Sequence, residues 1–196
     1  MTALAFVDVE TTGLSPHRQH HTWEIAVIRR ENGHDLEYLW QRRVFIASAD
    51  PEALAINRYH QRFRVPDGEQ AIALPTDTSG ETYTLSDAQL RNEVTAALSG
   101  AVLIGSNPGF DAGGIGAYLL AEPWHYRPLD VITLAAGYLI GAGRAAEVTI
   151  PYSSRTLSRA LGIEPPGADD AHTALPDARW MRDLYDAIPT AVPGSV

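Results

Sequence analysis

Apolar segments of strand length open the chain, and segments with helical periodicity come later. Residues 3–9, 23–28 and 36–45 have the length and apolar content of β-strands, and an Asn-Gly pair between the last two is typical of a hairpin turn. A fully apolar strand over residues 101–104 then alternates with helical patterns. Three successive strands followed by such alternation predict an α/β fold with a mixed β-sheet flanked by α-helices.

Capping signals and apolar stripes place the helices. Asp50 before Pro51 is typical of a helix start, and Ser86 precedes Gln89 with the spacing of a capping box. Further helices are expected over residues 110–120, 130–140, 154–161 and 172–187.

The segment 65–84 has no useful periodicity and is rich in Gly, Pro and Thr, which favours a loop or an insertion. At 196 residues, the chain suits one domain of ordinary size rather than two. We therefore expect a single domain over residues 1–187, with 65–84 as its loop or insertion and 188–196 as a C-terminal tail.

Composition argues against several classes of protein. Apolar residues make up 45% of the chain and charged residues 20%, which is the balance of a globular protein rather than of a disordered or membrane chain. The absence of cysteine excludes disulfides and thiolate metal sites. The net charge of −9 argues against broad binding of long nucleic acids, but it is compatible with a metal-filled site that holds only a strand end.

The sequence gives no signal for a membrane segment. The N-terminus has no basic stretch, and Asp8 and Glu10 interrupt its apolar run, so we expect neither a signal peptide nor an anchor. No stretch approaches the roughly 18 uninterrupted apolar residues that a bilayer requires. We expect a cytoplasmic protein with no membrane partner.

Two carboxylates stand one residue apart at the end of the first predicted strand. Residues i and i+2 of a strand point to the same face, so Asp8 and Glu10 converge while Val7 and Val9 point to the opposite face. Two negative charges held this close repel each other unless a cation lies between them, and Mg²⁺ or Mn²⁺ takes such oxygen ligands. The alternative is a strand end exposed to solvent, where two acids cost little.

Two further acids and a histidine occupy predicted helix starts. Asp111 follows the strand at 101–104, where open α/β sheets bind ligands, although an acid in a first helical turn also matches the helix dipole. His172 precedes Asp177 by five residues near the start of the last predicted helix. Taken alone, this histidine is typical of a cap or surface residue, and Asp177 of a dipole-matching acid.

Taken together and in order, these motifs resemble those of the DEDDh exonuclease family. That family has Asp-x-Glu on its first strand, Phe-Asp after a middle strand and His-x₄-Asp on its last helix. The matching segments here are Asp8-Val9-Glu10-Thr11-Thr12-Gly13-Leu14, Phe110-Asp111 and His172-Thr173-Ala174-Leu175-Pro176-Asp177-Ala178, with Leu157-Ser158-Arg159-Ala160-Leu161-Gly162-Ile163 ahead of the last. The resemblance covers residues 3–187 apart from 65–84. Ser106 departs from it, because many relatives have histidine at that position.

The resemblance implies a ribonuclease H-like fold and the release of nucleoside 5′-monophosphates from the 3′ end of DNA or RNA. It implies two Mg²⁺ or Mn²⁺ ions with four carboxylate ligands, which are Asp8, Glu10, Asp111 and Asp177. It also implies that His172 is the general base. The chemistry of these residue types agrees, because carboxylates supply hard oxygen ligands and a histidine with a pKa of about 6.5 accepts a proton from water near neutral pH.

By the same resemblance, residues around the first two motifs bind the terminal nucleotide. The backbone and hydroxyls of Thr11 and Thr12 would meet the 3′ end, and Leu14 and Phe110 would pack against its base. Core packing is the alternative for Leu14 and Phe110, and Asn107 either contacts a phosphate or caps its turn.

Two other groups of residues have alternative interpretations. Trp23 and Glu24 resemble an aromatic and acidic pair of the family's second strand, although core packing is the safer interpretation of Trp23. Arg58, Arg62 and Arg64 either guide a phosphate backbone or form an exposed, charged helix end.

Other functions use fewer of these residues. A catalytically silent nucleic-acid-binding module would keep the fold but has no use for four carboxylates and a histidine. A glycoside hydrolase with two carboxylates leaves Asp111, His172 and Asp177 without a shared role. The expected partners are single-stranded or frayed 3′ ends, and a homodimer and a separate polymerase partner both remain open. The sequence does not distinguish DNA from RNA as the substrate.

Overall fold

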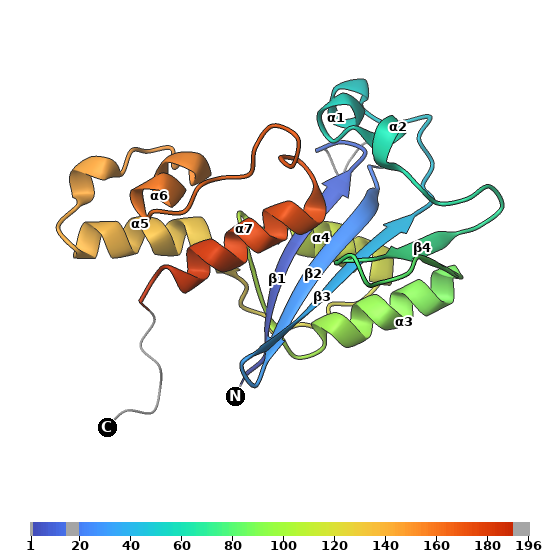
Figure 1. The fold of residues 1–196 in the computed structure, drawn as a ribbon, viewed down its shortest axis with the longest axis horizontal. Coiled ribbons are helices and arrows are strands. Elements are labelled where there is room, and N and C mark those ends of the chain that lie inside the picture. Colours follow the sequence, from blue (N-terminus) through green and yellow to red (C-terminus); the bar gives the residue numbers. More distant parts are fainter. Residues whose placement is uncertain (1, 15–19, 190–196) are drawn as a thin grey trace.

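The computed structural model describes residues 2–14 and 20–189, which form one mixed β-sheet with helices on both faces (Figure 1). The strands are β1 (Leu4–Thr11), β2 (Thr22–Glu31), β3 (His34–Arg42), β4 (Ala71–Leu74), β5 (Tyr83–Leu85), β6 (Val102–Gly105) and β7 (Leu129–Asp130). The helices are α1 (Pro51–Ile56), α2 (Tyr59–Arg62), α3 (Asp87–Leu98), α4 (Pro108–Leu119), α5 (Val131–Gly141), α6 (Ser154–Ala160) and α7 (Ala174–Asp186), with the short 3₁₀ helix η2 (Ala145–Glu147). The predicted α/β fold with a mixed sheet is confirmed.

The strand order in the sheet is β5-β4-β3-β2-β1-β6-β7. Strands β1 to β5 pair antiparallel with their neighbours in sequence, whereas β6 lies parallel to β1 and β7 parallel to β6. The β2–β3 hairpin turns at Asn32 and Gly33, which both have positive φ, as the Asn-Gly pair predicts. The ladder between β1 and β6 covers Leu4–Phe6, and β1 continues past it to Thr11.

Alternate residues of β1 face two different helix layers. Val7 and Val9 belong to the core that includes residues of α3 and α4. Phe6 belongs to the second core, which includes residues of α5, α6 and α7. The same alternation places Asp8 and Glu10 on the α7 face of the sheet, as the strand period predicts.

A third, smaller cluster lies beneath α1 and α2. Trp23 on β2 is fully buried and meets the ring of Tyr59 edge-on at a centroid distance of 5.0 Å. Leu54 on α1 completes this cluster. Core packing of Trp23 is therefore confirmed, and it seats the two short helices against the end of the sheet.

The predicted capping signals are confirmed. The Asp50 side chain accepts a hydrogen bond from the backbone N–H of Glu52, with Pro51 at the first helical position of α1. Ser86 and Gln89 form a reciprocal capping box at the start of α3.

The segment 65–84 is not a loop without regular structure, which corrects one of its two predicted alternatives, and its interpretation as an insertion stays a prediction. It contains β4 and the first residues of β5, which extend the sheet beyond β3. Both strands are short, and Pro75 and Gly80 lie between them, so no run of alternating residues is long enough to reveal them. The domain also extends past residue 187, because Ile188 is buried beside α7, whereas residues 190–196 of the predicted tail lie outside the described residues.

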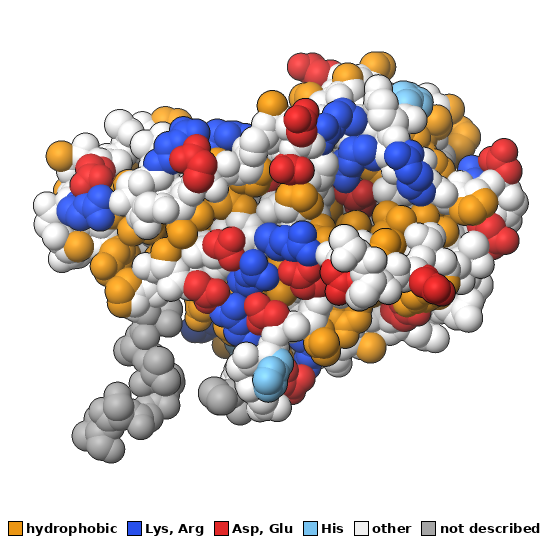
Figure 2. Space-filling view, viewed as in Figure 1, with side chains coloured by type: hydrophobic (Ala, Val, Ile, Leu, Met, Phe, Trp, Pro, Cys, Tyr) orange, Lys and Arg blue, Asp and Glu red, His pale blue; other side chains and the backbone are white. Residues whose placement is uncertain are grey.

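The helices of the described ranges 2–14 and 20–189 and the charges on one face of the molecule both bear on the expectations from composition. None of the helices there combines the length and the apolar character that crossing a bilayer requires. On the face shown in Figure 2, blue arginine and red acidic side chains alternate instead of forming a broad basic surface.

Candidate active site

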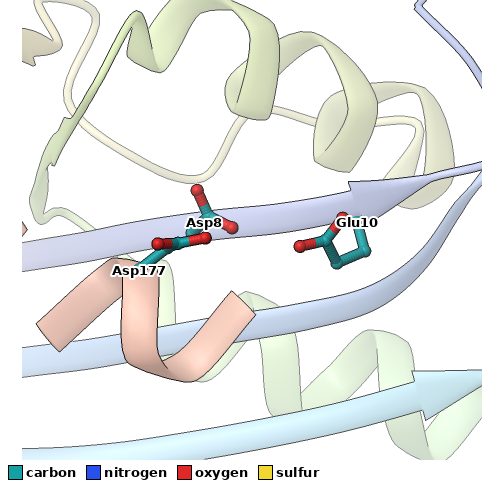
Figure 3. Close-up of side chains that lie close together, drawn as sticks. All are labelled: Asp8, Glu10 and Asp177. Atoms are coloured by element: carbon teal, nitrogen blue, oxygen red, sulfur yellow. The ribbon is translucent and has the colours of Figure 1, made fainter. Parts of the chain in front are cut away.

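Three carboxylates from two elements meet beside the end of β1. Asp8 and Glu10 leave the same face of β1, and Asp177 comes from the first turn of α7. One carboxylate oxygen from each residue lies within 4.8 Å of the other two. In Figure 3, Asp8 lies beside Asp177 and the Glu10 carboxylate turns toward them. Three oxygens held by a strand and a helix are the kind of ligand set that a hard divalent cation requires.

Asp111 lies next to this group but outside it. It occupies the first turn of α4, is 4% exposed, and its Oδ1 accepts a hydrogen bond from the backbone N–H of Val9 at 3.1 Å. This N–H lies beyond the ladder between β1 and β6, which ends at Phe6. The carboxylate of Asp111 is thus fixed to the strand that carries Asp8.

Burial and mutual repulsion raise the pKa values of these carboxyl groups. Burial, followed by the charges of Asp111 and Glu10, raises the pKa of Asp8 well above its ordinary value. Burial and the charge of Glu24 raise the pKa of Glu10 to about 8, and burial raises the pKa of Asp111 to about 7. Burial also raises the pKa of Asp177. Without a cation the cluster therefore holds protons near neutral pH, and a divalent cation would displace them.

Glu24 is a fifth carboxylate, which the three motifs do not assign. It lies opposite Glu10 in the register of β1 and β2 and is 2% exposed. Gln41 Nε2 donates to it at 2.8 Å, the backbone N–H of Ala174 donates at 3.2 Å, and Arg62 forms an ion pair with it. Its oxygens are therefore already bonded, and Glu24 supports the site instead of binding a cation. An acid within an apolar strand is the sequence signal that points to it.

His172 lies two residues before α7, with an exposed side chain and a left-handed backbone at a φ of 58°. Its carbonyl oxygen accepts a hydrogen bond from Arg62 Nη1 at 3.0 Å. The backbone N–H of Thr173 donates to Asp177 Oδ2 at 3.3 Å, and this bond and the charge of His172 oppose the effect of burial on the Asp177 pKa. The structure thus brings His172 to Asp177 and leaves the imidazole open to solvent.

The two threonines after Glu10 differ in their availability. Thr11 is partly exposed, and its Oγ1 donates to the carbonyl of Gly13 at 3.0 Å. Thr12 is fully buried, and its Oγ1 accepts a hydrogen bond from the backbone N–H of His21 at 2.8 Å. The Thr12 hydroxyl therefore holds the chain inside the protein, which corrects the expectation that it meets a 3′ end.

Asn107 does not cap α4 through its side chain. It occupies the cap position with a φ of 57°, makes no side-chain cap hydrogen bond, and is exposed. Of the two interpretations of Asn107, capping of the turn by its side chain is thus excluded.

Leu14 and Phe110 line a cavity of about 550 Å³, whose described lining contains none of the four carboxylates. They are 78% and 37% exposed, so core packing is wrong for both of them. The walls come from the end of β1 and the chain after it, from β2, β3 and α3, and from one side of α4. Because Thr11 and Phe110 line the cavity and are chain neighbours of Glu10 and Asp111, the cavity and the carboxylates share two anchoring segments.

The helices α1 and α2 connect the cavity to the His172 turn. On one side, Asn57 Nδ2 donates to the Thr11 carbonyl at 2.8 Å. On the other side, Arg58 Nη2 donates to the Asp169 carbonyl at 2.5 Å, and Arg62 binds His172 as described. For these two arginines, the predicted exposed helix end is wrong, because both are partly buried and bonded to the loop before α7.

Arg64 differs from its two neighbours. It is exposed, and its guanidinium donates to the Gln61 carbonyl at 2.5 Å within its own segment. Sequence patterns gave no signal for the contacts of Asn57 and Arg62, since their partners lie far away along the chain.

Comparisons with known proteins do not identify the chain. A scan against models of protein families found no match, and a search of the curated proteins found none either. The case for a function therefore depends on this chain's own carboxylates, histidine and cavity.

Proposed function

We propose that this protein is a metal-dependent 3′–5′ exonuclease with a ribonuclease H-like fold and the chemistry of the DEDDh family. The observation that carries the proposal is the meeting of Asp8, Glu10 and Asp177 within 4.8 Å, with Asp111 fixed alongside. Burying these carboxylates together is unfavourable by itself, as their raised pKa values show. Bound divalent cations would offset the repulsion among these carboxylates, and metal binding therefore accounts for the cluster.

Each residue has a role in the proposed chemistry. Two Mg²⁺ or Mn²⁺ ions, when bound, would activate a water and stabilise the leaving oxygen of a phosphodiester. Asp8, Glu10 and Asp177 would hold them together with Asp111. His172 would accept the proton of the attacking water, a role that its exposed imidazole and its place beside Asp177 support.

The cavity supports a strand end as the substrate. Leu14 and Phe110 offer apolar surface to one base, and the neighbouring carboxylates would meet its phosphate. The alternation of charges in Figure 2 and the net charge of −9 are unsuited to a long phosphate track. Recognition of a single terminal nucleotide needs no such track.

The test is the release of 5′-monophosphates from 3′-labelled and 5′-labelled single-stranded DNA and RNA, with Mg²⁺, with Mn²⁺ or with EDTA. We expect metal-dependent shortening from the 3′ end. Asp8→Asn, which keeps the side-chain shape but loses the charge, should lower turnover by about 10²–10³-fold or more. The matched control is Asp67→Asn, because Asp67 is an exposed acid remote from the cluster and should leave turnover unchanged.

A folded protein that binds these strands but releases no nucleotide with any metal would contradict the proposal. That result would favour the catalytically silent binding module. Comparing the DNA and RNA strands in the same assay also ranks the two substrates.

A further inference from the structure

We propose that Arg42 reads the base of the 3′-terminal nucleotide and makes the cavity prefer guanine to adenine. This inference depends on the proposed exonuclease function and adds the base selectivity of the same site. It follows from the shape of the cavity, from the bonding state of Arg42 and from the donor pattern of a guanidinium.

The shape of the cavity suits a planar ring. Two exposed apolar side chains, Leu14 and Phe110, belong to its lining, and one wall is a side of α4 that carries Gly109, Gly113 and Ala117 at intervals of four residues. A Cβ added at either glycine would point into open space. This wall is therefore flat and free of side chains that would obstruct a base, and its contacts would be sequence-tolerant.

Two arginine side chains of the cavity lining lie against the ring of Tyr118. The guanidinium carbons of Arg42 and Arg91 lie 4.1 Å and 4.4 Å from the centre of the Tyr118 ring. Arg91 is neutralised, since its Nε donates to the Asp87 carboxylate at 2.7 Å.

Arg42 differs from Arg91 in its bonding. Its Nη1 donates to the Thr22 carbonyl at 2.9 Å, but its Nε is buried without a hydrogen-bond partner. Arg42 forms no ion pair with any residue in the described ranges, and burial lowers the pKa of its guanidinium. The buried Nε is closed to a ligand, so a ligand in the cavity that Arg42 lines would meet the terminal amino groups of the guanidinium. Partly buried charges are normally paired, and an acceptor on the ligand would supply that pairing.

The lining chemistry narrows the ligand. The described residues of the lining include no Asp or Glu, and a guanidinium offers only donors. Guanine presents O6 and N7 side by side as two acceptors, whereas adenine replaces O6 with an amino donor. The two purines have similar size and stacking surface. Arg42 would therefore distinguish them by the group at position 6, which is an acceptor in guanine and a donor in adenine.

A phosphate is the competing acceptor, and the layout of the site favours the base. Glu10 and Asp111 would take the phosphate through the metal ions, and none of the four carboxylates lines the cavity, whose described lining includes their chain neighbours Thr11 and Phe110. A nucleotide held at both places would place its base, and not its phosphate, in the cavity that Arg42 lines.

The experiment compares purine nucleotides in two readouts. Binding of 5′-GMP, 5′-IMP and 5′-AMP is measured by calorimetry with Mg²⁺, and single-turnover hydrolysis is measured on strands that differ only in a 3′-terminal guanine, hypoxanthine, adenine or 2-aminopurine. We expect about tenfold tighter binding and faster release for the two bases with O6. Hypoxanthine should behave like guanine because it lacks only the 2-amino group, and 2-aminopurine should behave like adenine.

Two matched variants test the role of Arg42. Arg42→Met keeps the side-chain length but removes all donors, and it should abolish the preference. Arg43→Met should retain it, because Arg43 binds the carbonyls of Val65 and Pro66 and does not line the cavity. Arg42→Lys keeps the charge without the planar fork, so it should lose most of the preference even if the Met variant does not fold.

The outcomes separate this inference from the proposed function. Equal binding of GMP and AMP by the wild type would overturn it, as would an Arg42→Met variant that weakens both nucleotides equally, which indicates a phosphate contact. A clear preference for GMP in the binding assay without hydrolysis would support base recognition and refute the exonuclease. Equal binding of both purines, with hydrolysis of both strands at equal rates, would support the exonuclease and refute base recognition by Arg42.

Discussion

The backbone of His172 is in the left-handed region, which makes the choice of a test variant important. Asparagine tolerates positive φ better than most residues, so His172→Asn removes the base with little change in the turn. We expect this variant to lower kcat by about 10²–10⁴-fold at pH 7.5 while divalent metal binding is retained. The measurements are single-turnover nucleotide release and calorimetric titration with Mn²⁺.

The wild-type dependence of log kcat on pH gives a second readout for His172. An acidic limb in the wild type that is absent from the residual activity of His172→Asn would identify the imidazole as the group that loses a proton. Unchanged kcat in His172→Asn would mean that another group is the base.

Some residues of the candidate site can be predicted from the sequence because their positions follow from the geometry of one strand or one motif. The period of two in a strand is sufficient to converge Asp8 and Glu10. A helix start alone predicts only a dipole-matching acid at Asp177, and the resemblance to the His-x₄-Asp motif adds Asp177 to the site. The contacts of Arg42 and Arg62 have no such rule. Each depends on partners from distant segments, such as Tyr118 for Arg42, which only the packed fold brings together.

At the scale of elements, α1 and α2 tie the His172 turn to the sheet through the ion pair of Arg62 and Glu24. Arg62→Met would leave the buried Glu24 charge without its cation and would release the His172 carbonyl. We expect a loss of about 3–5 kcal/mol in the free energy of unfolding and a lower kcat. Chemical denaturation and single-turnover release measure the two effects.

Removing both partners separates stability from positioning. The double variant Glu24→Gln with Arg62→Met should regain most of the lost stability, because no buried charge remains unpaired, yet it should not regain kcat. The control is Arg64→Met, since the Arg64 side chain is exposed and its guanidinium bonds only to the carbonyls of Gln61 and Phe63 in its own segment. Full activity in the double variant would show that α1 and α2 do not position the His172 turn.

Elements differed in how well the sequence predicted them. Long helices with caps, such as α3, had both a start signal and an apolar stripe. Strands β4 and β5 have neither length nor uninterrupted alternation. They form because β3 offers an edge to β4, and β4 in turn offers an edge to β5. Such pairing is a tertiary effect that local patterns do not contain.

At the scale of the whole molecule, the carboxylate cluster makes stability depend on pH and metal. Glu10 has a pKa of about 8 in the folded protein, against 4.5 as its ordinary value, and Asp111 has a pKa of about 7 against 3.8. Between these values the folded state binds more protons than the unfolded state, so stability is greatest below the ordinary pKa values and falls as pH rises toward 8.

Thermal unfolding in EDTA should therefore show a Tm that falls by several degrees between about pH 5 and about pH 8. Mg²⁺ or Mn²⁺ would replace the protons, so the increase in Tm on adding metal should be larger at the upper pH than at the lower. Glu10→Gln is the matched variant, because it removes one titrating group and keeps the side-chain shape. It should flatten the decline in EDTA and reduce the gain from metal. A Tm in EDTA that rises steadily across this range, with no added gain from metal at high pH, would mean that the cluster neither holds protons nor exchanges them for a cation.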